Sequence, residues 1–187
     1  MTADKTFSQD NFSTSGLPDS AFDNCTFINC LFTGVNLSET SFLECIFEDC
    51  DFSMANLDQT AFKDVRFKNC KLTGVDFSGC NAFLLEMKFD GCQLNLASFY
   101  RLNLKETPFG ECSLVECDFT EADLHGATFD DCDLNGAVFE QCNLEKADFR
   151  TAYNYTINPE INRVRKARFS RDGVMGLLRQ LDIVIEG

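Results

Sequence analysis

The sequence predicts an all-β solenoid, a quadrilateral parallel β-helix of about eight coils, closed by a short C-terminal α-helix and strand. The first observation behind this prediction is a period of five: Phe or Leu occupies every fifth position from Phe7 to Phe77 and, after a slip of two residues, from Leu84 to Phe149. The second is that all eleven cysteines lie two residues before such a position, if Cys80 closes the first register. Repetition this regular indicates a rod with its function on the outside.

Each five-residue unit is expected to be a short strand followed by a corner. Its two regular positions, a large one (Phe or Leu) and a minor one two residues earlier, share one face because alternate side chains of a strand point the same way. Leu returns to the large position every 20 residues, at Leu17, Leu37 and Leu57. The same interval separates Cys30 from Cys50. Four strands therefore complete one coil, and neighbouring coils should lie about 4.8 Å apart through parallel hydrogen bonds.

The slip near 80–86 interrupts the period once. Asn81, Ala82 and Phe83 carry the two extra residues, and Phe83 belongs to neither register. Two interpretations stay open for it: a bulged corner, or a projecting knob that contacts a partner.

Both ends of the predicted rod differ from its middle. Lys5 and Asp10 occupy minor positions at the start, which requires a first coil that is open to water. Beyond Phe149 the pattern weakens but keeps its register, with Val164 and Phe169 in large positions. We therefore assign residues 1–169 to the β-helix.

In residues 170–187 the apolar spacing becomes helical. Ser170 can serve as an N-cap, and the run that starts at Ile183 predicts a short strand. This segment can cap the open end alone, or cap it and also pair with the same segment of a second copy. The candidate residues for that cap and dimer interface are Val174, Leu177, Leu178, Leu181, Ile183 and Ile185.

The repeat resembles that of the pentapeptide repeat proteins, whose motif is a small residue, Asp or Asn, Leu or Phe, and two variable residues. Ala122-Asp123-Leu124-His125-Gly126 and Ala147-Asp148-Phe149-Arg150-Thr151 match it directly. The resemblance covers most of the chain and implies that the four-sided β-helix is right-handed.

Composition and motifs favour a non-enzymatic protein of a reducing cytoplasm. Eleven cysteines in a predicted core argue for reduced thiols, and their five-residue spacing follows the repeat and not a zinc motif. No apolar run reaches membrane-spanning length, and the N-terminus lacks a signal-peptide core. The single histidine, His125, stands in an outward position without a partner motif, and no phosphate loop or nucleophile elbow occurs. We expect no cofactor, metal site or direct contact with membranes or nucleic acid.

Charge is the remaining signal. Residues 1–162 contain 27 acidic and 10 basic residues, and the whole chain has a net charge of −14. A body of about 38 Å would then carry one net negative charge per about 2.2 Å, against one per about 1.7 Å of duplex DNA. Such a rod can replace DNA on a DNA-binding protein, although acidity can also serve solubility alone. Within 106–148 the candidate partner-binding residues are Glu106, Glu111, Glu116, Asp118, Glu121, Asp123, Asp130, Asp131, Asp133, Glu140, Glu145 and Asp148.

A second resemblance concerns the tail. Ile157-Asn158-Pro159-Glu160-Ile161-Asn162 and the apolar residues after it look like the end of the microcin immunity protein, and the plan is similar to the Qnr-type and mycobacterial-type proteins. This resemblance implies a homodimer joined through its C-termini that imitates DNA and binds a type II topoisomerase (DNA gyrase or topoisomerase IV). Qnr-type proteins carry projecting loops, whereas this chain has only the two-residue slip, so drug protection is the less secure part. The alternative is a general interaction scaffold with an unrelated partner.

Overall fold

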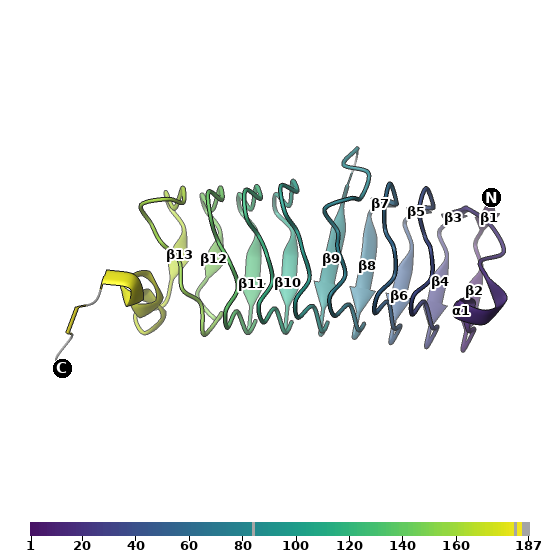
Figure 1. Ribbon diagram of the computed structural model, residues 1–187, viewed down its shortest axis with the longest axis horizontal. Coiled ribbons are helices and arrows are strands. Elements are labelled where there is room, and N and C mark those ends of the chain that lie inside the picture. The colour runs from purple at the N-terminus through teal and green to yellow at the C-terminus, as the bar shows by residue number, and fades with distance from the viewer. Residues whose placement is uncertain (84, 182, 185–187) are drawn as a thin grey trace.

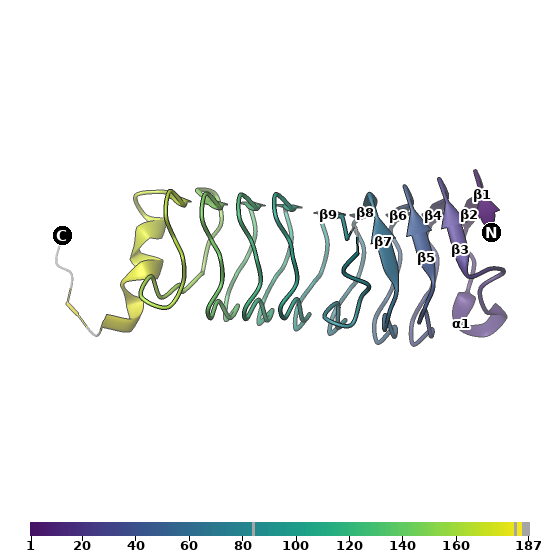
Figure 2. The same ribbon diagram turned by 90° about the horizontal axis from the view of Figure 1, so that it is seen from above.

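The protein forms a long four-sided rod, seen from two directions in Figures 1 and 2. The computed structural model describes residues 1–83, 85–181 and 183–184; the expectations for Leu84 and Ile185 therefore lie outside the described residues. The N-terminus lies at one end of the rod, and the C-terminal segment extends beyond the other. The predicted solenoid is thus confirmed.

Every strand pairing in the rod is parallel, and two sides carry regular sheets. One sheet has nine strands in the order β13-β12-β11-β10-β9-β8-β6-β4-β2, and the other has four in the order β1-β3-β5-β7. Nine strands stacked on one side are separated by eight turns of the chain, in agreement with the eight predicted coils. The strands of the large sheet are β2 (Thr6–Ser8), β4 (Thr26–Ile28), β6 (Ile46–Glu48), β8 (Val65–Lys68), β9 (Met87–Asp90), β10 (Pro108–Gly110), β11 (Thr128–Asp130), β12 (Asp148–Phe149) and β13 (Arg168–Phe169). Those of the small sheet are β1 (Thr2–Ala3), β3 (Ala21–Asp23), β5 (Ser41–Leu43) and β7 (Ala61–Lys63).

We number the four sides of the rod as faces 1 to 4 in chain order. In each coil a face consists of one inward large residue and the two residues on either side of it. Face 1 is the nine-stranded sheet, in which Phe27 pairs with Phe47. Face 2 is a row of single bridges that runs from Asn11 to Tyr153. Face 3 is the row that includes the Asp76–Ser98–Asp118–Val138 bridges, and face 4 is the four-stranded sheet followed by the bridges from Asn103 to Arg163.

Stacked aromatic rings fill the interior. On face 1 the rings of Phe27 and Phe47 lie 4.7 Å apart and within 15° of parallel, and rings on adjacent faces meet edge-on, as Phe27 and Phe32 do at 5.6 Å. Each such ring is almost inaccessible to water. Burying one contributes roughly 1.5–3 kcal/mol, with about 0.5–1.5 kcal/mol more for each favourable ring pair. The period of five therefore builds one continuous core along the rod.

Six cysteines form one buried column behind face 2. The column continues across the slip, because Lys71 bridges Gln93 and so places Cys70 beside Cys92. The column consists of Cys30, Cys50, Cys70, Cys92, Cys112 and Cys132, all free thiols. Most of these thiols also approach carbonyl oxygens of neighbouring residues, as Cys50 Sγ does with Phe27 O at 3.4 Å. Burial raises the pKa of Cys30 to about 11, so this thiol stays neutral in the fold.

The slip is confined to face 4. Face 1 continues through it, since Phe67 pairs with Phe89, whereas the four-stranded sheet of face 4 ends at β7. The backbone N–H of Asn81 donates to Thr60 O at 2.9 Å, and the Asn81 side chain accepts a hydrogen bond from Phe83 N–H at 2.9 Å. The loop projects from the rod (Figure 1), and Phe83 is 78 % exposed. A bulged corner is therefore confirmed, and the knob interpretation remains to be tested.

The N-terminal coil contains a helical turn that the sequence pattern did not predict. α1 (Phe12–Ser15) replaces the second side of this coil, and the Asn11 side chain caps it by accepting a hydrogen bond from Ser13 N–H at 3.1 Å. Lys5 and Asp10 are exposed, as expected for an open first coil.

The C-terminal segment corrects two expectations. The expected α-helix is instead a pair of 3-10 helices, η1 (Gly173–Leu177) and η2 (Arg179–Leu181). Two glycines let this segment lie directly against Tyr155: a Cβ on Gly173 would overlap the Tyr155 hydroxyl, and one on Gly176 would lie 2.5 Å from Tyr155 O. Ile183 and Val184 are not in a strand, because no described strand lies beside them to pair with. Ser170 does cap the turn, since its hydroxyl accepts from Gly173 N–H at 2.9 Å.

Candidate interaction surface

The described residues offer no enclosed site for chemistry. None of them form a group of three or more His, Cys, Asp or Glu placed to hold a metal ion. No helix within the described chain is long and apolar enough to cross a bilayer. A hollow of about 490 Å³ at the corner of faces 4 and 1 and another of about 510 Å³ along face 1 are both open grooves. His125 is half-buried on face 4 beside a smaller groove.

The twelve candidate acidic residues do not form one patch. The 20-residue coil distributes the stretch 106–148 around all four faces, because neighbours in sequence soon turn a corner. Face 1 receives Glu111, Asp130, Asp131 and Asp148, and face 2 receives Glu116 and Asp133. Face 3 receives Asp118, Glu121 and Glu140, and face 4 receives Glu106, Asp123 and Glu145.

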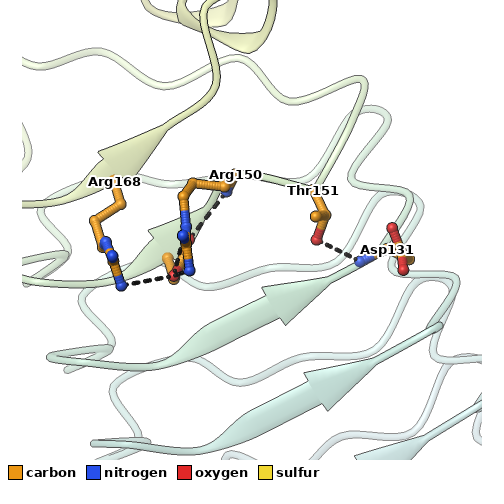
Figure 3. Close-up of polar contacts among 5 residues, drawn as sticks. Asp131, Arg150, Thr151 and Arg168 are labelled. Carbon is orange, nitrogen blue, oxygen red and sulfur yellow. Dashed lines mark hydrogen bonds and ion pairs between the residues drawn. The ribbon is translucent and has the colours of Figure 1, made fainter.

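Four of the twelve are held in ion pairs with basic residues, namely Glu121, Asp123, Glu145 and Asp148. Asp148 is the most enclosed, with Arg150 at 2.7 Å and Arg168 at 3.3 Å (Figure 3). The hydrogen bond from Arg150 lowers the pKa of Asp148. Beside this cluster the Thr151 hydroxyl accepts from Asp131 N–H at 2.9 Å, also drawn in Figure 3. The four paired carboxylates are partly neutralised by their basic partners, so they offer less negative charge to a binding partner.

Sorting every charge by face gives a clearer pattern. Face 1 carries seven acidic and seven basic residues, and face 4 carries seven and six. Face 2 carries four and one, and face 3 carries eight and one. Half of the net charge of −14 therefore lies on one side of the rod. The acidic residues of face 3 are Asp19, Glu39, Asp58, Asp76, Asp118, Glu121, Glu140 and Glu160.

Face 3 places a carboxylate on every coil except one. That coil carries Arg101, which pairs with Glu121 of the next coil at 2.7 Å and lies 4.8 Å over the Tyr100 ring. The hydrogen bond from Arg101 lowers the pKa of Glu121. Among the described residues, the other carboxylates between Glu39 and Glu140 have no basic partner within ion-pair distance. Most carboxylates of this face are thus unpaired, on coils that lie about 4.8 Å apart.

Sequence reasoning missed Glu39, Asp58 and Asp76 because it grouped acidic residues by proximity along the chain. The signal that identifies them is the 20-residue period, applied to outward positions as well as to inward ones. Toward the C-terminal end of the rod, basic residues on faces 1 and 4 neutralise part of this acidity: Arg163 pairs with Glu145 at 3.0 Å, and Arg150 and Arg168 share Asp148.

The candidate dimer residues are divided between the core and the surface. Leu177 packs against the core and Leu178 is half-buried, whereas Val174, Leu181 and Ile183 are 40 %, 50 % and 54 % exposed. The C-terminal end of the rod thus combines exposed apolar side chains with basic side chains on faces 1 and 4.

The chain belongs to the pentapeptide repeat family. The sequence profile of the pentapeptide repeat region matches it three times, over residues 20–99, 41–119 and 82–152. No protein in the curated collection matches the chain by sequence.

Solved pentapeptide repeat structures share the fold at low identity. Trypsin-treated QnrB1, a plasmid-mediated fluoroquinolone resistance protein, has a TM-score of 0.66 and 18 % identity over 99 % of both chains. HetL, involved in heterocyst differentiation regulation in the cyanobacterium Nostoc sp. Strain PCC 7120, has a TM-score of 0.61 and 16 % identity over 92 % of this chain and 90 % of its own. At this identity the likeness establishes the fold alone.

Proposed function

We propose that this protein is a non-enzymatic rod that mimics duplex DNA and binds a type II topoisomerase, DNA gyrase or topoisomerase IV. Binding would modulate the enzyme or protect it from quinolones or peptide toxins. The observation that carries the proposal is the column of carboxylates on face 3, with an acidic residue on every coil except one and a single basic residue.

The physical basis is charge per unit length on a rigid support. Each strand of duplex DNA presents one negative charge per about 3.4 Å of axis, and the steps of face 3 are about 4.8 Å. Parallel hydrogen bonds and stacked rings hold these steps in place, so little ordering is needed on binding. A cationic DNA-binding surface could therefore accept face 3 in place of a phosphate backbone.

We further propose that the protein acts in the cytoplasm as a homodimer joined through the C-terminus. Eleven reduced, buried thiols suit a reducing compartment. The exposed side chains of Val174, Leu181 and Ile183 offer an apolar surface for a second copy. The basic residues of faces 1 and 4 at this end would then lie near the centre of the dimer, between two acidic arms.

The test is a binding and supercoiling assay with purified DNA gyrase. A variant with Asp58, Asp76, Asp118 and Glu140 changed to Lys should lose at least about tenfold in affinity and inhibition, and the wild-type affinity should fall steeply with salt. The matched control changes Glu111, Glu116, Asp130 and Asp131 to Lys. It changes the net charge by the same amount as the face 3 variant, but on faces 1 and 2. Equal losses in both variants would mean that only net charge matters and would remove face 3 from the proposal. No binding by the wild type to gyrase or topoisomerase IV would refute it.

The alternative function is a general interaction scaffold. It is favoured by the similar fold likeness to HetL, whose described role differs from that of QnrB1. The same assay separates the two, because a scaffold with an unrelated partner would leave both topoisomerases unaffected.

A further inference from the structure

Exposed apolar side chains gather at the edges of face 3. Among the described residues between 2 and 181, the three most exposed large apolar side chains are Met54, Phe83 and Leu96, at 81 %, 78 % and 58 %. Met54 and Leu96 stand at the corner where face 2 turns into face 3, and Phe83 stands in the slip loop of face 4, four residues past the corner at Gly79 where face 3 turns into face 4. Apolar residues therefore lie at one edge of the most acidic face and just beyond its other edge.

The fold itself does not require apolar residues at these corners. Met54 and Leu96 have φ of 59° and 62°, the left-handed conformation that favours glycine. Glycine occupies the same corner one coil away from each, at Gly34 and Gly74. A long apolar side chain in this slot is unfavourable for stability in two ways, because its backbone conformation is strained and its apolar surface is exposed to water. Because these residues do not stabilise the fold, a role at the protein surface is needed to explain them.

Phe83 is presented by an anchored loop. Hydrogen bonds hold the loop on both sides, from Asn81 N–H to Thr60 O at 2.9 Å and from Glu86 N–H to Phe62 O at 3.0 Å. The Asn81 side chain further orders the turn by accepting from Phe83 N–H. Figure 1 shows this loop as the one departure from the outline of the rod between its ends. The aromatic ring is therefore held outward, and its ordering cost on binding is small.

The three side chains frame a small acidic area. Met54 lies one coil before Gly74 and Leu96 one coil after it, so they are separated by two coil steps, about 9.6 Å along the axis. Phe83 follows Gly74 in the same coil and lies beyond the opposite edge, in the slip loop of face 4. Between the edges lie the exposed carboxylates of Asp58 and Asp76, and Gly79 leaves no side chain in the way. The result is an apolar triangle around two anions.

We propose that Met54, Phe83 and Leu96 are the apolar anchors of the docking surface, and that they place the partner across face 3 at Asp58 and Asp76. The partner that fits is a protein with a cationic strip flanked by apolar depressions on both sides. This inference rests on the proposed function and adds a feature that duplex DNA lacks. The carboxylates govern the association rate and the salt dependence, and the anchors govern the dissociation rate.

The experiment compares two triple variants by binding kinetics with DNA gyrase at several salt concentrations. The anchor variant carries Met54→Gln, Phe83→Ser and Leu96→Gln. The control carries Leu31→Gln, Ile46→Gln and Tyr153→Gln, which are 43 %, 37 % and 49 % exposed on faces 2 and 1. The anchor variant should dissociate about tenfold faster with an unchanged salt slope, and the control should stay within about twofold of the wild type. Thermal unfolding checks that both variants keep the wild-type fold.

Three results would overturn the inference. Unchanged kinetics in the anchor variant, with binding still lost in the face 3 charge variant, would leave the proposed function intact and remove the anchors. Equal effects in the anchor and control variants would show that exposed apolar area acts without regard to position. Absence of wild-type binding to gyrase and topoisomerase IV would overturn the proposed function and, with it, this inference.

Discussion

Faces 1 and 3 enclose the same core but present different surfaces. On face 1 seven acidic residues meet seven basic ones, and most ion pairs run from one coil to the next, as Lys68–Glu48 does at 2.9 Å. On face 3 eight acidic residues meet one basic residue, Arg101. Behind both faces, aromatic rings stack at nearly the same spacing, 5.1 Å for Phe109–Phe129 and for Phe99–Phe119.

This difference in charge matching indicates that faces 1 and 3 have different roles. A face that only needs to be stable can match charges across coils, because each coil offers its neighbour a residue about 4.8 Å away. Face 3 leaves its anions unmatched, which adds repulsion to the folded state and is tolerable because exposed charges are well screened. Unmatched charge on a rigid face is the pattern expected of a surface reserved for a partner.

The largest effect should be the same on both faces. Phe109→Ala on face 1 and Phe119→Ala on face 3 should each lower the free energy of unfolding by about 3–5 kcal/mol, because each removes a fully buried ring from a stack. Denaturant titration of the two variants measures this. A clear inequality between them would mean that the faces differ in their cores as well as in their surfaces.

The next effect separates a paired carboxylate from an unpaired one. Asp148→Asn should lower stability at pH 7 by about 1–2 kcal/mol, because Asp148 accepts bonds from two arginines. Asp118→Asn on face 3 should change stability little, since its bond from Thr120 N–H needs only an oxygen. The pKa of Asp148 is lowered in the fold, so its contribution is present above its unfolded-state pKa of about 3.9 and is lost as pH falls through the native value. Unfolding curves between pH 7 and pH 2.5 should therefore converge for Asp148→Asn and the wild type.

A third comparison concerns the corners that bound the faces. Gly74 borders face 3 at φ of 68° with open space around it, so Gly74→Ala should cost about 1 kcal/mol, the strain of the left-handed backbone. Gly91 borders face 1 at φ of 61°, and an added Cβ would lie 2.5 Å from Asn69 Oδ1. Gly91→Ala should cost about 1–2 kcal/mol, with the excess over Gly74→Ala measured by chemical denaturation. Equal costs would indicate that the Asn69 side chain moves away freely.

The smallest effect should have opposite signs on the two faces. Asp58→Asn combined with Asp76→Asn should raise the melting temperature by about 1–2 °C in low salt, because it relieves repulsion on face 3. Glu48→Gln should lower it by a similar amount, because it releases Lys68 on face 1. Both shifts should shrink in 0.5 M salt, as scanning calorimetry would show. Shifts of the same sign would contradict the assignment of face 3 as an unmatched surface.

The architecture could be predicted because its determinants are strictly local and repeated. The large and minor positions name the residues of the core, and the 20-residue return of Leu17, Leu37 and Leu57 sets the number of sides. The C-terminal cap was less predictable, because Gly173 and Gly176 adapt to Tyr155, a contact between segments that no periodicity encodes. The α1 turn depends in the same way on one cap from Asn11.

The candidate surface was only partly predictable, for a geometric reason. Distance along this chain is a poor guide to position on the rod, since the bridges from Asp76 through Ser98 to Asp118 place these two carboxylates on one face, whereas Lys71, close to Asp76 in sequence, lies on face 2. Ion pairs such as Arg163–Glu145 also depend on side-chain placement across coils. Sorting outward residues by coil position recovers the face, but the apolar frame around it required the exposed fractions of Met54, Phe83 and Leu96.

The buried cysteines can report which coils of the rod separate during local unfolding. At least one thiol lies in nearly every coil from Cys25 to Cys142, and alkylating reagents reach a thiol only after its coil has separated from the next. Brief exposure to such a reagent, followed by mass spectrometry of each cysteine, would reveal whether unravelling starts at the open first coil, at the interruption beside Phe83 or at the C-terminal cap. A partner that clamps the rod would slow the labelling most in the coils beneath its footprint, and would thereby mark its position without any change to the protein.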